Sequence, residues 1–466
     1  MHCLFLNDFD QMEKVASFFS FEENAHTERV KTSQFSLWPF LRIYLASQLT
    51  FGYDRRVQAN TSHFKKLVKY FFRGFNCWFK RFDIIVLSSS DQRKLINGKY
   101  TDRIDLLNYD QNKILFLELP SPDHYNAGST ASKNLISRLN LFAIEIIIAK
   151  LFSAKKLQGK EIIADAEKLG AHIDADGLSK RFHAQHRVFS WLLSRWKPRL
   201  LIVVNSYTNM PYVKAAKDKG IGVVEMQHGV IGEKHYAYQI RFKPDRSYYP
   251  DYLLSFGKSE QVIFGGKNNF IAAEKVIPVG SFYIDYISKH LKLYPEIEHF
   301  GKFRLRVCIS GQIAFEAKML SFLTALAALC PDVMFAYVPR NINEELEQFS
   351  WPRNTVLIRG MNVYECISVC DIHSTINSTC AIESLSLGTP NILMNIENRS
   401  KEYFGESLGK QAFTAFADNP KEFANILRNC ATPPRAEVRA VNENFIVNNF
   451  ESRLNEAINS ILGKHD

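Results

Sequence analysis

The residues Gln227, His228 and Gly229 directly follow the apolar run GIGVVEM. The run predicts a buried strand, and a glycine after the histidine allows the backbone to turn sharply. We therefore expect His228 at the carboxyl end of a strand, where open α/β sheets bind their ligands. An imidazole with a pKa near ~6.5 is available as a neutral base at pH 7 and can take a proton from a hydroxyl group. A histidine that caps a strand inside the core is the alternative.

Polar and aromatic side chains continue beyond this turn, with His235 and Tyr238 within the next ten residues. We expect both to shape the same cleft, although a Tyr–His pair that only supports the core explains them equally well. If His228 is structural, Glu225, His235 and Asp123 are the next candidates for a base. Two further segments after predicted strands are candidates for ligand contacts, with an ordinary loop as the alternative: SSSDQRK (residues 88–94) and SPDHY (residues 121–125).

A second set of polar residues lies in the segment DIHSTINSTCAIESLSLGTPNILMN. A short strand is expected to end near His373, and a loop with Ser374, Ser378 and Thr379 leads into a helix that starts near Cys380. Small hydroxyl residues at a helix start are common N-caps, which is the simpler explanation. The same geometry also exposes backbone N–H groups and the positive end of the helix dipole, which together can hold a phosphate.

Other side chains are placed to contact the same ligand. Glu383 lies one turn into the predicted helix, where its carboxylate can accept hydrogen bonds from a ribose or sugar hydroxyl. Arg340 follows the predicted strand VMFAYV and can offer two N–H groups to a phosphate. Gly311 and Gln312, in the segment ISGQ, end another strand and are weaker candidates, since an ordinary strand-to-helix turn also explains them.

Short apolar strands that alternate with helices are needed to position these groups, and the chain shows this pattern twice. The first run has the strands FDIIVLSS, KILFLEL, RLLIVV, IGVVEM, DYLLS and KVIPV, with an amphipathic helix over residues 134–156. The polar segment SKHLKLYPEIEHFGK then interrupts the pattern and is the best candidate for a linker. The second run has the strands FRLRVCIS, VMFAYV, DIHST and TPNILMN. Such alternation is typical of doubly wound parallel sheets.

The pattern predicts an α/β protein with two Rossmann-like domains that meet near residues 285–302. A chain of 466 residues exceeds what one compact core usually supports. The first domain is expected over residues 1–285, with a helical elaboration at its amino-terminal end, and the second over residues 303–433. The helical tail, residues 434–466, is expected to pack back on the first domain. Two such domains that face each other across a cleft describe the GT-B architecture.

The motifs carry a resemblance to a known family. HSTINSTCAIESLSLGTP looks like the donor-binding segment of GT-B glycosyltransferases, in which a Ser-rich loop precedes Glu and Gly-x-Pro. EMQHG with the following HYAY resembles bacterial capsule and surface-polysaccharide glycosyltransferases, and is more distantly similar to teichoic acid polymerases and to Kdo and sialyl transferases. The resemblance covers about residues 200–395. These distant relatives carry His-Pro where this chain has Pro339 and Arg340, so the nucleotide stays open.

The resemblance implies a glycosyltransferase that moves a sugar from a nucleotide-activated donor to a glycan or lipid-linked acceptor in bacterial surface-polysaccharide synthesis (capsule, O-antigen or lipopolysaccharide). It implies His228 as the base for the acceptor hydroxyl, and a base in this role implies direct displacement with inversion at the anomeric carbon. We expect His235 and Tyr238 to shape the acceptor side of the cleft. The nucleotide sugar is a co-substrate, and no other cofactor is expected. No metal is expected either, because helix N–H groups and an arginine can stabilise the departing phosphate.

The net charge of +10 and a pI near 9.0 indicate an anionic partner. The stretch FKKLVKYFFRGFNCWFKRF, residues 64–82, carries six Lys or Arg residues and no acid. No RNA- or DNA-binding motif accompanies it, so nucleic acid is not expected as a partner. An amphipathic helix on an anionic bilayer fits the stretch and would suit a lipid-linked acceptor. A helix whose aromatic side chains fill the amino-terminal core fits it equally well.

The remaining features favour the cytoplasm, either free or peripheral on the inner face of the cytoplasmic membrane. The amino-terminal stretch MHCLFLNDFDQME is acidic where a signal peptide needs basic residues, and no apolar run is long enough to span a bilayer. Eight cysteines without zinc-site spacing are typical of free thiols in a reducing compartment. Two alternatives stay open: a sugar-nucleotide epimerase of similar shape, which needs carboxylates, and a non-enzymatic basic scaffold that binds membrane or nucleic acid and no nucleotide.

Overall fold

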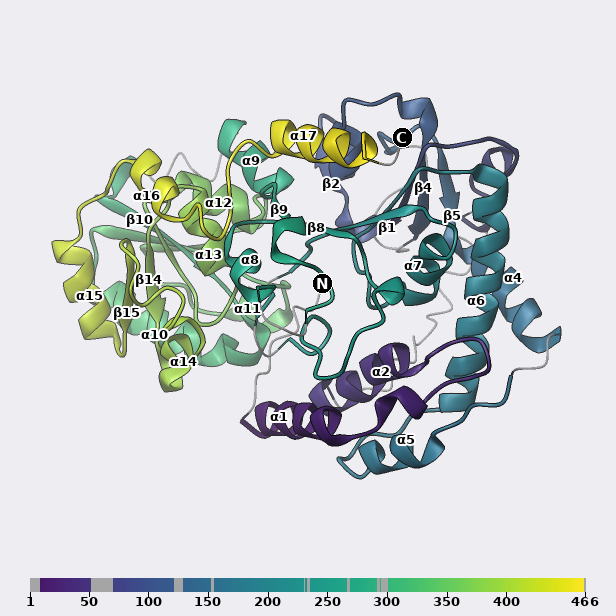
Figure 1. Ribbon diagram of the computed structural model, residues 1–466. Coiled ribbons are helices and arrows are strands. Elements are labelled where there is room, and N and C mark those ends of the chain that lie inside the picture. The colour runs from purple at the N-terminus through teal and green to yellow at the C-terminus, as the bar shows by residue number, and fades with distance from the viewer. Residues whose placement is uncertain are drawn as a thin grey trace. The chain divides into compact units, whose positions relative to one another are not determined.

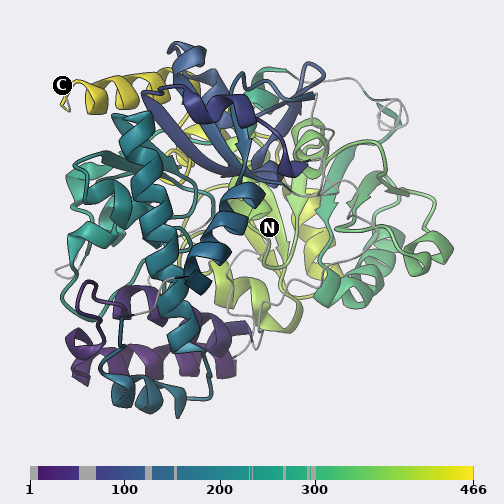
Figure 2. The same ribbon diagram turned by 90° about the vertical axis from the view of Figure 1, so that its right-hand side faces the viewer.

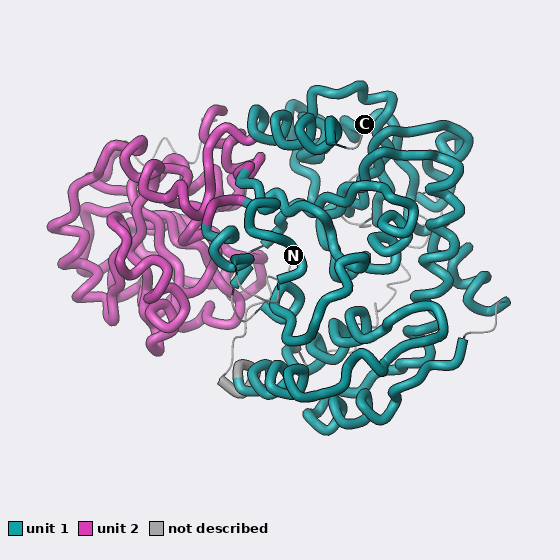
Figure 3. The backbone as a smooth tube through the Cα atoms, viewed as in Figure 1, with its two compact units in different colours: residues 1–255, 259–278, 451–466 teal, residues 256–258, 279–450 magenta. Residues whose placement is uncertain are grey.

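The computed structural model of the chain describes residues 9–51, 70–120, 129–151, 155–229, 231–232, 235–265, 269–290, 294 and 301–464. The chain divides into two compact units (Figure 3). Unit 1 contains residues 1–255, 259–278 and 451–466, and unit 2 contains residues 256–258 and 279–450. Each unit is built around a parallel sheet of its own.

Unit 1 has a seven-stranded sheet in the order β5-β4-β1-β6-β7-β8-β9, and all its strands are parallel. In chain order the strands are β1 (Ile84–Ser89), β4 (Ile114–Leu119), β5 (Leu135–Ser137), β6 (Leu200–Val203), β7 (Gly222–Met226), β8 (Tyr252–Ser255) and β9 (Val276–Pro278). The chain starts in the middle of the sheet, moves to one edge and then returns to build the other half. The strand order therefore reverses between β1 and β6, which is the topological switch point where such sheets bind ligands.

Three helices cover one face of this sheet. They are α4 (Arg138–Leu151), α6 (Ala175–Trp196) and α7 (Met210–Lys217). Alternate strand residues point to this face, and Ile85 and Leu87 of β1 pack there with Leu192 and Trp196 of α6. The long helix α6 packs against both α4 and α7, and α4 and α6 run beside each other in Figure 2.

The amino-terminal helices form a second apolar core in unit 1. They are α1 (Phe9–Asn24) and α2 (Trp38–Phe51), together with the later helix α5 (Lys160–Glu167) (Figure 1). Phe18, Trp38 and Phe40 are fully buried there with Phe182 of α6. A small antiparallel hairpin, β2 (Lys94–Ile96) and β3 (Lys99–Thr101), follows β1.

The carboxyl-terminal helix α17 (Phe450–Leu462) belongs to unit 1 from Glu451 onward. Its Asn455 side chain accepts a hydrogen bond from the Asn108 backbone N–H at 2.6 Å, and Arg199 donates to the Leu462 carbonyl at 3.1 Å. The preceding helix α16 (Arg435–Val441) belongs to unit 2. Only the last helix of the expected tail therefore packs with the amino-terminal part of the chain.

Unit 2 has a six-stranded parallel sheet in the order β12-β11-β10-β13-β14-β15. In chain order the strands are β10 (Leu305–Ser310), β11 (Val333–Val338), β12 (Thr355–Leu357), β13 (Ile372–Ser374), β14 (Asn391–Met394) and β15 (Thr414–Ala417). Numbered along the chain, this order is 3-2-1-4-5-6, the arrangement of a Rossmann sheet. The switch point lies between β10 and β13.

Helices cover both faces of this sheet. Val307 and Ile309 of β10 pack against α10 (Glu316–Leu329) and α15 (Pro420–Asn429), while Cys308 points to the opposite face with α9 (Phe282–Lys289) and α12 (Val363–Val369). Strands buried on both faces need apolar residues at every position, which explains their continuous apolar runs. The other helices of the unit are α11 (Glu344–Gln348), α13 (Cys380–Ser386), α14 (Arg399–Phe404) and α16.

The expected fold class, two Rossmann-like α/β domains, is confirmed by the two separate parallel sheets. The boundary between the units lies at Pro278 and Val279, so α9 packs with unit 2, although residues 279–285 were expected in the first domain. Most of the expected linker lies outside the described residues. Among the described residues, no helix combines the length and apolar character needed to cross a bilayer.

Candidate functional site

Two clusters of predicted site residues form, one in each unit, at the carboxyl ends of the strands. In unit 1 the cluster follows β7, where His228 is half-buried in the turn after the strand. Gln227 fixes this turn, because its side-chain amide donates to the Gly229 carbonyl at 2.9 Å and to the carboxylate of Glu260 at 2.8 Å. Its backbone N–H also donates to the Leu254 carbonyl of the neighbouring strand at 2.9 Å. The turn that carries His228 is therefore held from both sides.

A buried arginine lies beside this turn. Arg103, at the start of the 3-10 helix η5 (Arg103–Leu106), donates to the Gln227 carbonyl at 2.8 Å and to the Gln92 side-chain oxygen at 3.0 Å. Its side chain is 8 % exposed, and its Nε atom has no hydrogen-bond partner among the described residues. Both of its acceptors are uncharged, so the guanidinium brings a weakly compensated positive charge close to His228.

Burial and this charge keep His228 in its neutral form. The pKa of His228 is lowered from 6.5 to about 4, first because burial disfavours the imidazolium and second because Arg103 repels it. The carbonyl of Val204 and the carboxylate of Asp91 oppose the shift in part. The Nδ1 atom is buried and has no hydrogen-bond partner among the described residues. A neutral imidazole whose ring nitrogen has no hydrogen-bond partner among the described residues can accept a proton.

The loop after β1 holds Gln92 and Arg103 in place. Arg93 is buried and forms ion pairs with Glu118 at the end of β4 and with Asp105 of η5, the latter at 3.1 Å. Ser88 of β1 donates to Asp102 at 2.8 Å, and Asp102 caps the start of η5. These bonds join β1, β4 and η5, so the segment SSSDQRK supports the His228 turn through Gln92. The segment SPDHY, including Asp123, lies outside the described residues.

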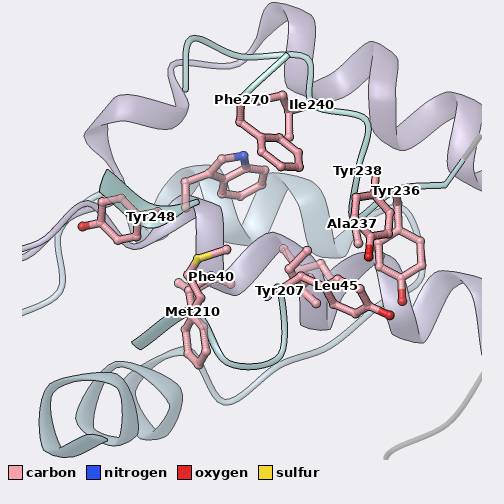
Figure 4. Packing of buried hydrophobic residues seen from close by; sticks show 14 of the residues in the cluster. Phe40, Leu45, Tyr207, Met210, Tyr236, Ala237, Tyr238, Ile240, Tyr248 and Phe270 are labelled. Atoms are coloured by element: carbon pink, nitrogen blue, oxygen red, sulfur yellow. The ribbon is translucent and has the colours of Figure 1, made fainter. Parts of the chain in front are cut away.

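His235 and Tyr238 lie close to His228, around the ring of Tyr207 (Figure 4 labels both tyrosines). The Tyr207 ring centroid is 6.2 Å from that of His228, 6.0 Å from His235 and 5.8 Å from Tyr238. Burial, and then the nearby His228, lower the pKa of His235 to about 3. Its Nδ1 accepts a hydrogen bond from the Ala237 N–H at 3.3 Å.

Tyr238 is a core residue, and its hydroxyl group is already engaged. It is 2 % exposed and donates to Glu225 at 2.7 Å, while Ser206 donates to the other oxygen of Glu225 at 2.6 Å. Burial raises the pKa of Glu225 to about 7 in spite of these bonds. Glu225 and Tyr238 therefore lie behind the His228 turn, where they support it.

A buried ion pair clamps the segment that follows. Arg42 of α2 pairs with Glu22 of α1, with Nε and Oε1 2.5 Å apart, and both side chains are almost fully buried. The same guanidinium donates to the carbonyls of Tyr236 at 2.7 Å and Gln239 at 3.0 Å. This is how the amino-terminal helices fix the HYAYQ segment, and it gives them a role in the site.

In unit 2 the predicted donor residues meet at the switch point between β10 and β13. Gln312, two residues after β10, uses its side-chain oxygen to accept hydrogen bonds from the N–H groups of Ile376 at 3.3 Å and Asn377 at 3.1 Å. Its amide nitrogen donates to the Asn377 side chain. Gly311 has no room for a side chain, because a Cβ atom there would lie 2.7 Å from the Tyr337 hydroxyl. Gln312 thus shapes the loop between β13 and α13.

The next residues of this loop are partly exposed. Ser378 accepts a hydrogen bond from the Cys380 N–H at 3.3 Å, and Thr379 donates to Glu383 at 3.4 Å. Tyr364 of α12 donates to the other oxygen of Glu383 at 3.0 Å. Among the described residues no acceptor is seen for the N–H groups of Ser378 and Thr379. The loop therefore has donors to offer to a ligand at the switch point.

Arg340 and Ser374 differ in their access to such a ligand. Arg340 is exposed after β11. Burial raises the pKa of the Cys380 thiol, at the start of α13, to about 12, and the charge of Arg340 offsets this shift in part. Ser374 is fully buried, and its hydroxyl oxygen has no partner among the described residues. Arg340 is therefore close to the loop and open to solvent, whereas Ser374 lies beneath it.

His373 is part of the support for this loop. It is fully buried, with Nε2 2.9 Å from the Ser310 hydroxyl and Nδ1 2.8 Å from the side-chain oxygen of Asn391. Ser384 also donates to that oxygen at 2.7 Å, and the Asn391 amide donates to the Ala381 carbonyl at 2.6 Å. Burial lowers the pKa of His373 to about 4. This network ties β10, β13 and α13 together.

The sequence did not lead us to Arg103, Tyr207 or Tyr364. Each of them reaches its site from a different element of the chain, so no local spacing marks it. Among the described residues, no group of three or more His, Cys, Asp or Glu side chains is arranged to hold a metal ion.

Comparison with known proteins supports the fold. No family model and no curated protein matches the sequence. Many solved structures match, and the three described next each align with 82 % of this chain. A protein from Listeria monocytogenes proposed to be a UDP-N-acetylglucosamine 2-epimerase matches over 98 % of its own length, with a TM-score of 0.51 and 11 % identity. The UDP-GlcNAc 2-epimerase from Neisseria meningitidis bound to UDP-GlcNAc matches over 100 %, with a TM-score of 0.50 and 14 % identity. The calicheamicin glycosyltransferase matches over 99 %, with a TM-score of 0.51 and 10 % identity.

Proposed function

We propose that the chain is a glycosyltransferase that takes a sugar from a nucleotide-activated donor and uses His228 as its base. The observation that carries this proposal is the state of His228: an imidazole at the carboxyl end of a strand, held neutral, with Nδ1 uncommitted among the described residues. A core histidine without a function normally has its ring nitrogens paired, as His373 does.

The donor phosphate is proposed to bind at the switch point of unit 2. The N–H groups of Ser378 and Thr379 would donate to its oxygens, and Arg340 would supply a positive charge. Glu383 would accept a hydrogen bond from a ribose or sugar hydroxyl. Gln312 would act indirectly, because it occupies the N–H groups of Ile376 and Asn377 and so fixes the loop in this shape.

The proposed reaction is a single displacement. The acceptor hydroxyl attacks the anomeric carbon as its proton passes to His228, and the bond from that carbon to the phosphate oxygen breaks. The nucleotide leaves with an added negative charge, which the loop N–H groups and Arg340 stabilise. Attack opposite the leaving group inverts the anomeric centre. This displacement, as proposed, uses no metal ion.

The biological setting rests on the motifs EMQHG and HYAY and their resemblance to capsule and surface-polysaccharide enzymes. We propose a glycan or lipid-linked acceptor in bacterial capsule, O-antigen or lipopolysaccharide synthesis, handled in the cytoplasm or at the inner face of the cytoplasmic membrane. His235 would shape the acceptor side, with Tyr238 supporting it from the core.

The proposal is tested by nucleotide release. The protein is incubated with a panel of nucleotide sugars, with and without a pool of cell-envelope glycolipids, and the free nucleotide is measured. Release that depends on both one donor and the pool is expected, and it should be lost in His228→Gln. The matched control is His290→Gln, which changes an exposed histidine of unit 2. Equal release by His228→Gln and the native protein would refute the role of His228.

A second candidate, a sugar-nucleotide 2-epimerase, is favoured by the solved structures from Listeria and Neisseria. Such a reaction inverts carbon 2 of the donor sugar and needs no acceptor. Incubation with UDP-GlcNAc in D₂O, followed by NMR, separates the two. The epimerase would yield the C2 epimer with deuterium at that carbon and no dependence on an acceptor, whereas the glycosyltransferase would leave the C2 proton in place.

A further inference from the structure

Large apolar side chains are exposed together on one part of unit 1. In the 3-10 helix η3 (Phe75–Phe79) the rings of Phe75 and Phe79 are 61 % and 69 % exposed, and Phe72 just before it is 68 % exposed. Exposed phenylalanines at this density are unusual on a soluble surface, and they mark sites of interaction.

These rings are presented by a rigid segment. Between them Cys77 and Trp78 are buried, and the Trp78 carbonyl accepts hydrogen bonds from Arg195 at 3.2 Å and from the indole of Trp196 at 3.3 Å. Gly74 has a φ of +76° and lies against the Leu135 carbonyl, where a Cβ atom would be only 1.8 Å from the oxygen. The segment is therefore fixed to α6 and to the edge strand β5.

The helices α4 and α6 also expose apolar side chains. On α4, Ile146, Ile147 and Leu151 are 57 %, 55 % and 72 % exposed, and on α6 Trp191 is 58 % exposed. The two helices pack side by side (Figure 2), and η3 contacts α6. Trp191 stands one turn before Arg195, whose guanidinium lies 5.1 Å from the centre of the Phe79 ring. We call η3, with Phe72, and the exposed side chains of α4 and α6 the η3 patch.

The charges around the η3 patch have one sign. Lys80, Arg81, Lys150, Arg187 and Arg195 are exposed around it. Residues 70–82 and 187–197 contain no acid, and the one acid of α4 is buried. Apolar rings flanked by cations, without acids, complement an anionic bilayer: the rings enter the headgroup region and the cations meet lipid phosphates. A protein partner would be expected to meet acidic residues as well.

We propose that the η3 patch docks unit 1 onto an anionic lipid bilayer. The docking is peripheral, since among the described residues no helix could cross a bilayer. This inference stands without the proposed function. Where both hold, docking brings the enzyme to a lipid-linked acceptor.

Vesicle binding tests the inference directly. The protein is floated with phosphatidylcholine vesicles, either pure or containing phosphatidylglycerol, and the bound fraction is measured at low and high salt. Binding is expected only to the anionic vesicles and should weaken with salt. Phe75→Ser with Phe79→Ser should reduce the partition by about tenfold or more, because each ring loses its apolar contact. The control is Val262→Ser, which removes an apolar side chain that is 82 % exposed elsewhere on unit 1.

Tryptophan fluorescence gives an independent readout. Trp191 is exposed, whereas Trp38, Trp78 and Trp196 are buried and Trp351 is half-buried in unit 2. A blue shift on adding anionic vesicles should therefore disappear in Trp191→Phe. No binding to anionic vesicles would overturn the proposal, as would binding unaffected by the double phenylalanine variant. A concentration-dependent dimer in sedimentation that the same variant abolishes, without vesicle binding, would overturn it in favour of a second copy of the chain. Thermal unfolding of each variant confirms that it folds.

Discussion

Replacing Arg103 separates the electrostatic role of this residue from its structural one. Arg103→Gln removes the charge beside His228, while Arg103→Lys keeps a charge but loses the forked geometry that reaches both Gln227 and Gln92. If Arg103 keeps the base neutral, the two variants should differ in the pH dependence of turnover. If it only holds the turn, both should lose activity without a change in that dependence.

The magnitude follows from the pKa of His228. The lowering of this pKa from 6.5 to about 4 corresponds to about 3 kcal/mol against the imidazolium. Only the neutral ring acts as a base, so kcat/KM should be constant near neutral pH and fall as the pH drops through about 4. In Arg103→Gln this acidic limb should move to a higher pH. The move should cover only the smaller part of the difference between about 4 and 6.5, because burial is the larger cause of the lowered His228 pKa.

The assay is nucleotide release as a function of pH, with buffers of constant ionic strength. The native protein and Arg103→Lys should show the limb near 4, and Arg103→Gln should show it at a higher pH. In His228→Ala turnover should fall by roughly 10²–10⁴ and the limb should vanish. A limb that stays in His228→Ala would refute His228 as the base. A limb at the same pH in the native protein and both Arg103 variants would show that Arg103 only holds the turn. Near-native turnover combined with lost stability would make the histidine structural.

Three further expectations concern unit 2 and the metal. Ser378→Ala and Glu383→Ala should raise the donor KM or lower kcat/KM with the fold intact by circular dichroism, and normal turnover in both would leave the loop as a plain helix cap. EDTA should leave activity unchanged, and loss of activity that Mg²⁺ or Mn²⁺ restores would contradict the metal-free mechanism. Because the pKa of His373 is lowered to about 4, its stabilising effect is full above 6.5 and is lost as the pH falls toward 4. Urea titrations at pH 7.5 and pH 5 give the free energy of unfolding that is lost on acidification. This loss should be about 2 kcal/mol smaller in His373→Gln than in the native protein.

The sequence predicts the central strands and the edge strand β9, but not the edge strands β5, β12 and β15. A strand buried on both faces is apolar at most positions, which is why β1, β6 and β7 stand out as apolar runs. The edge strands β5 and β12 have three residues each and only one neighbouring strand. The expected helix over residues 134–156 accordingly begins later, since Leu135–Ser137 pairs with β4 and the helix starts at Arg138.

The basic aromatic stretch, residues 64–82, has both buried and exposed aromatic side chains in its described part. Tyr70, Trp78 and Phe82 are buried as the core interpretation expects, while Phe75 and Phe79 are exposed. Membrane binding by the exposed rings stays a prediction. A helical period could not predict this pattern of burial, since the described segment turns at Gly74 and continues as a 3-10 helix. Composition indicates that such a stretch is amphipathic, but only the backbone decides which rings face solvent.

One signal for the His228 site was present in the sequence. The apolar run GIGVVEM contains Glu225, and a carboxylate in a buried strand needs hydrogen-bond donors, because burying it without them is costly. Ser206 and Tyr238 supply those donors. The presence of Glu225 in the run therefore indicates that Tyr238 belongs to the core. Arg103 had no such signal. It reaches the turn from η5 by bonding a backbone carbonyl, a contact that any residue type offers and that no spacing along the chain encodes. The proposed base is thus visible in the sequence, whereas the arginine that adds to the lowering of its pKa is found only in the fold.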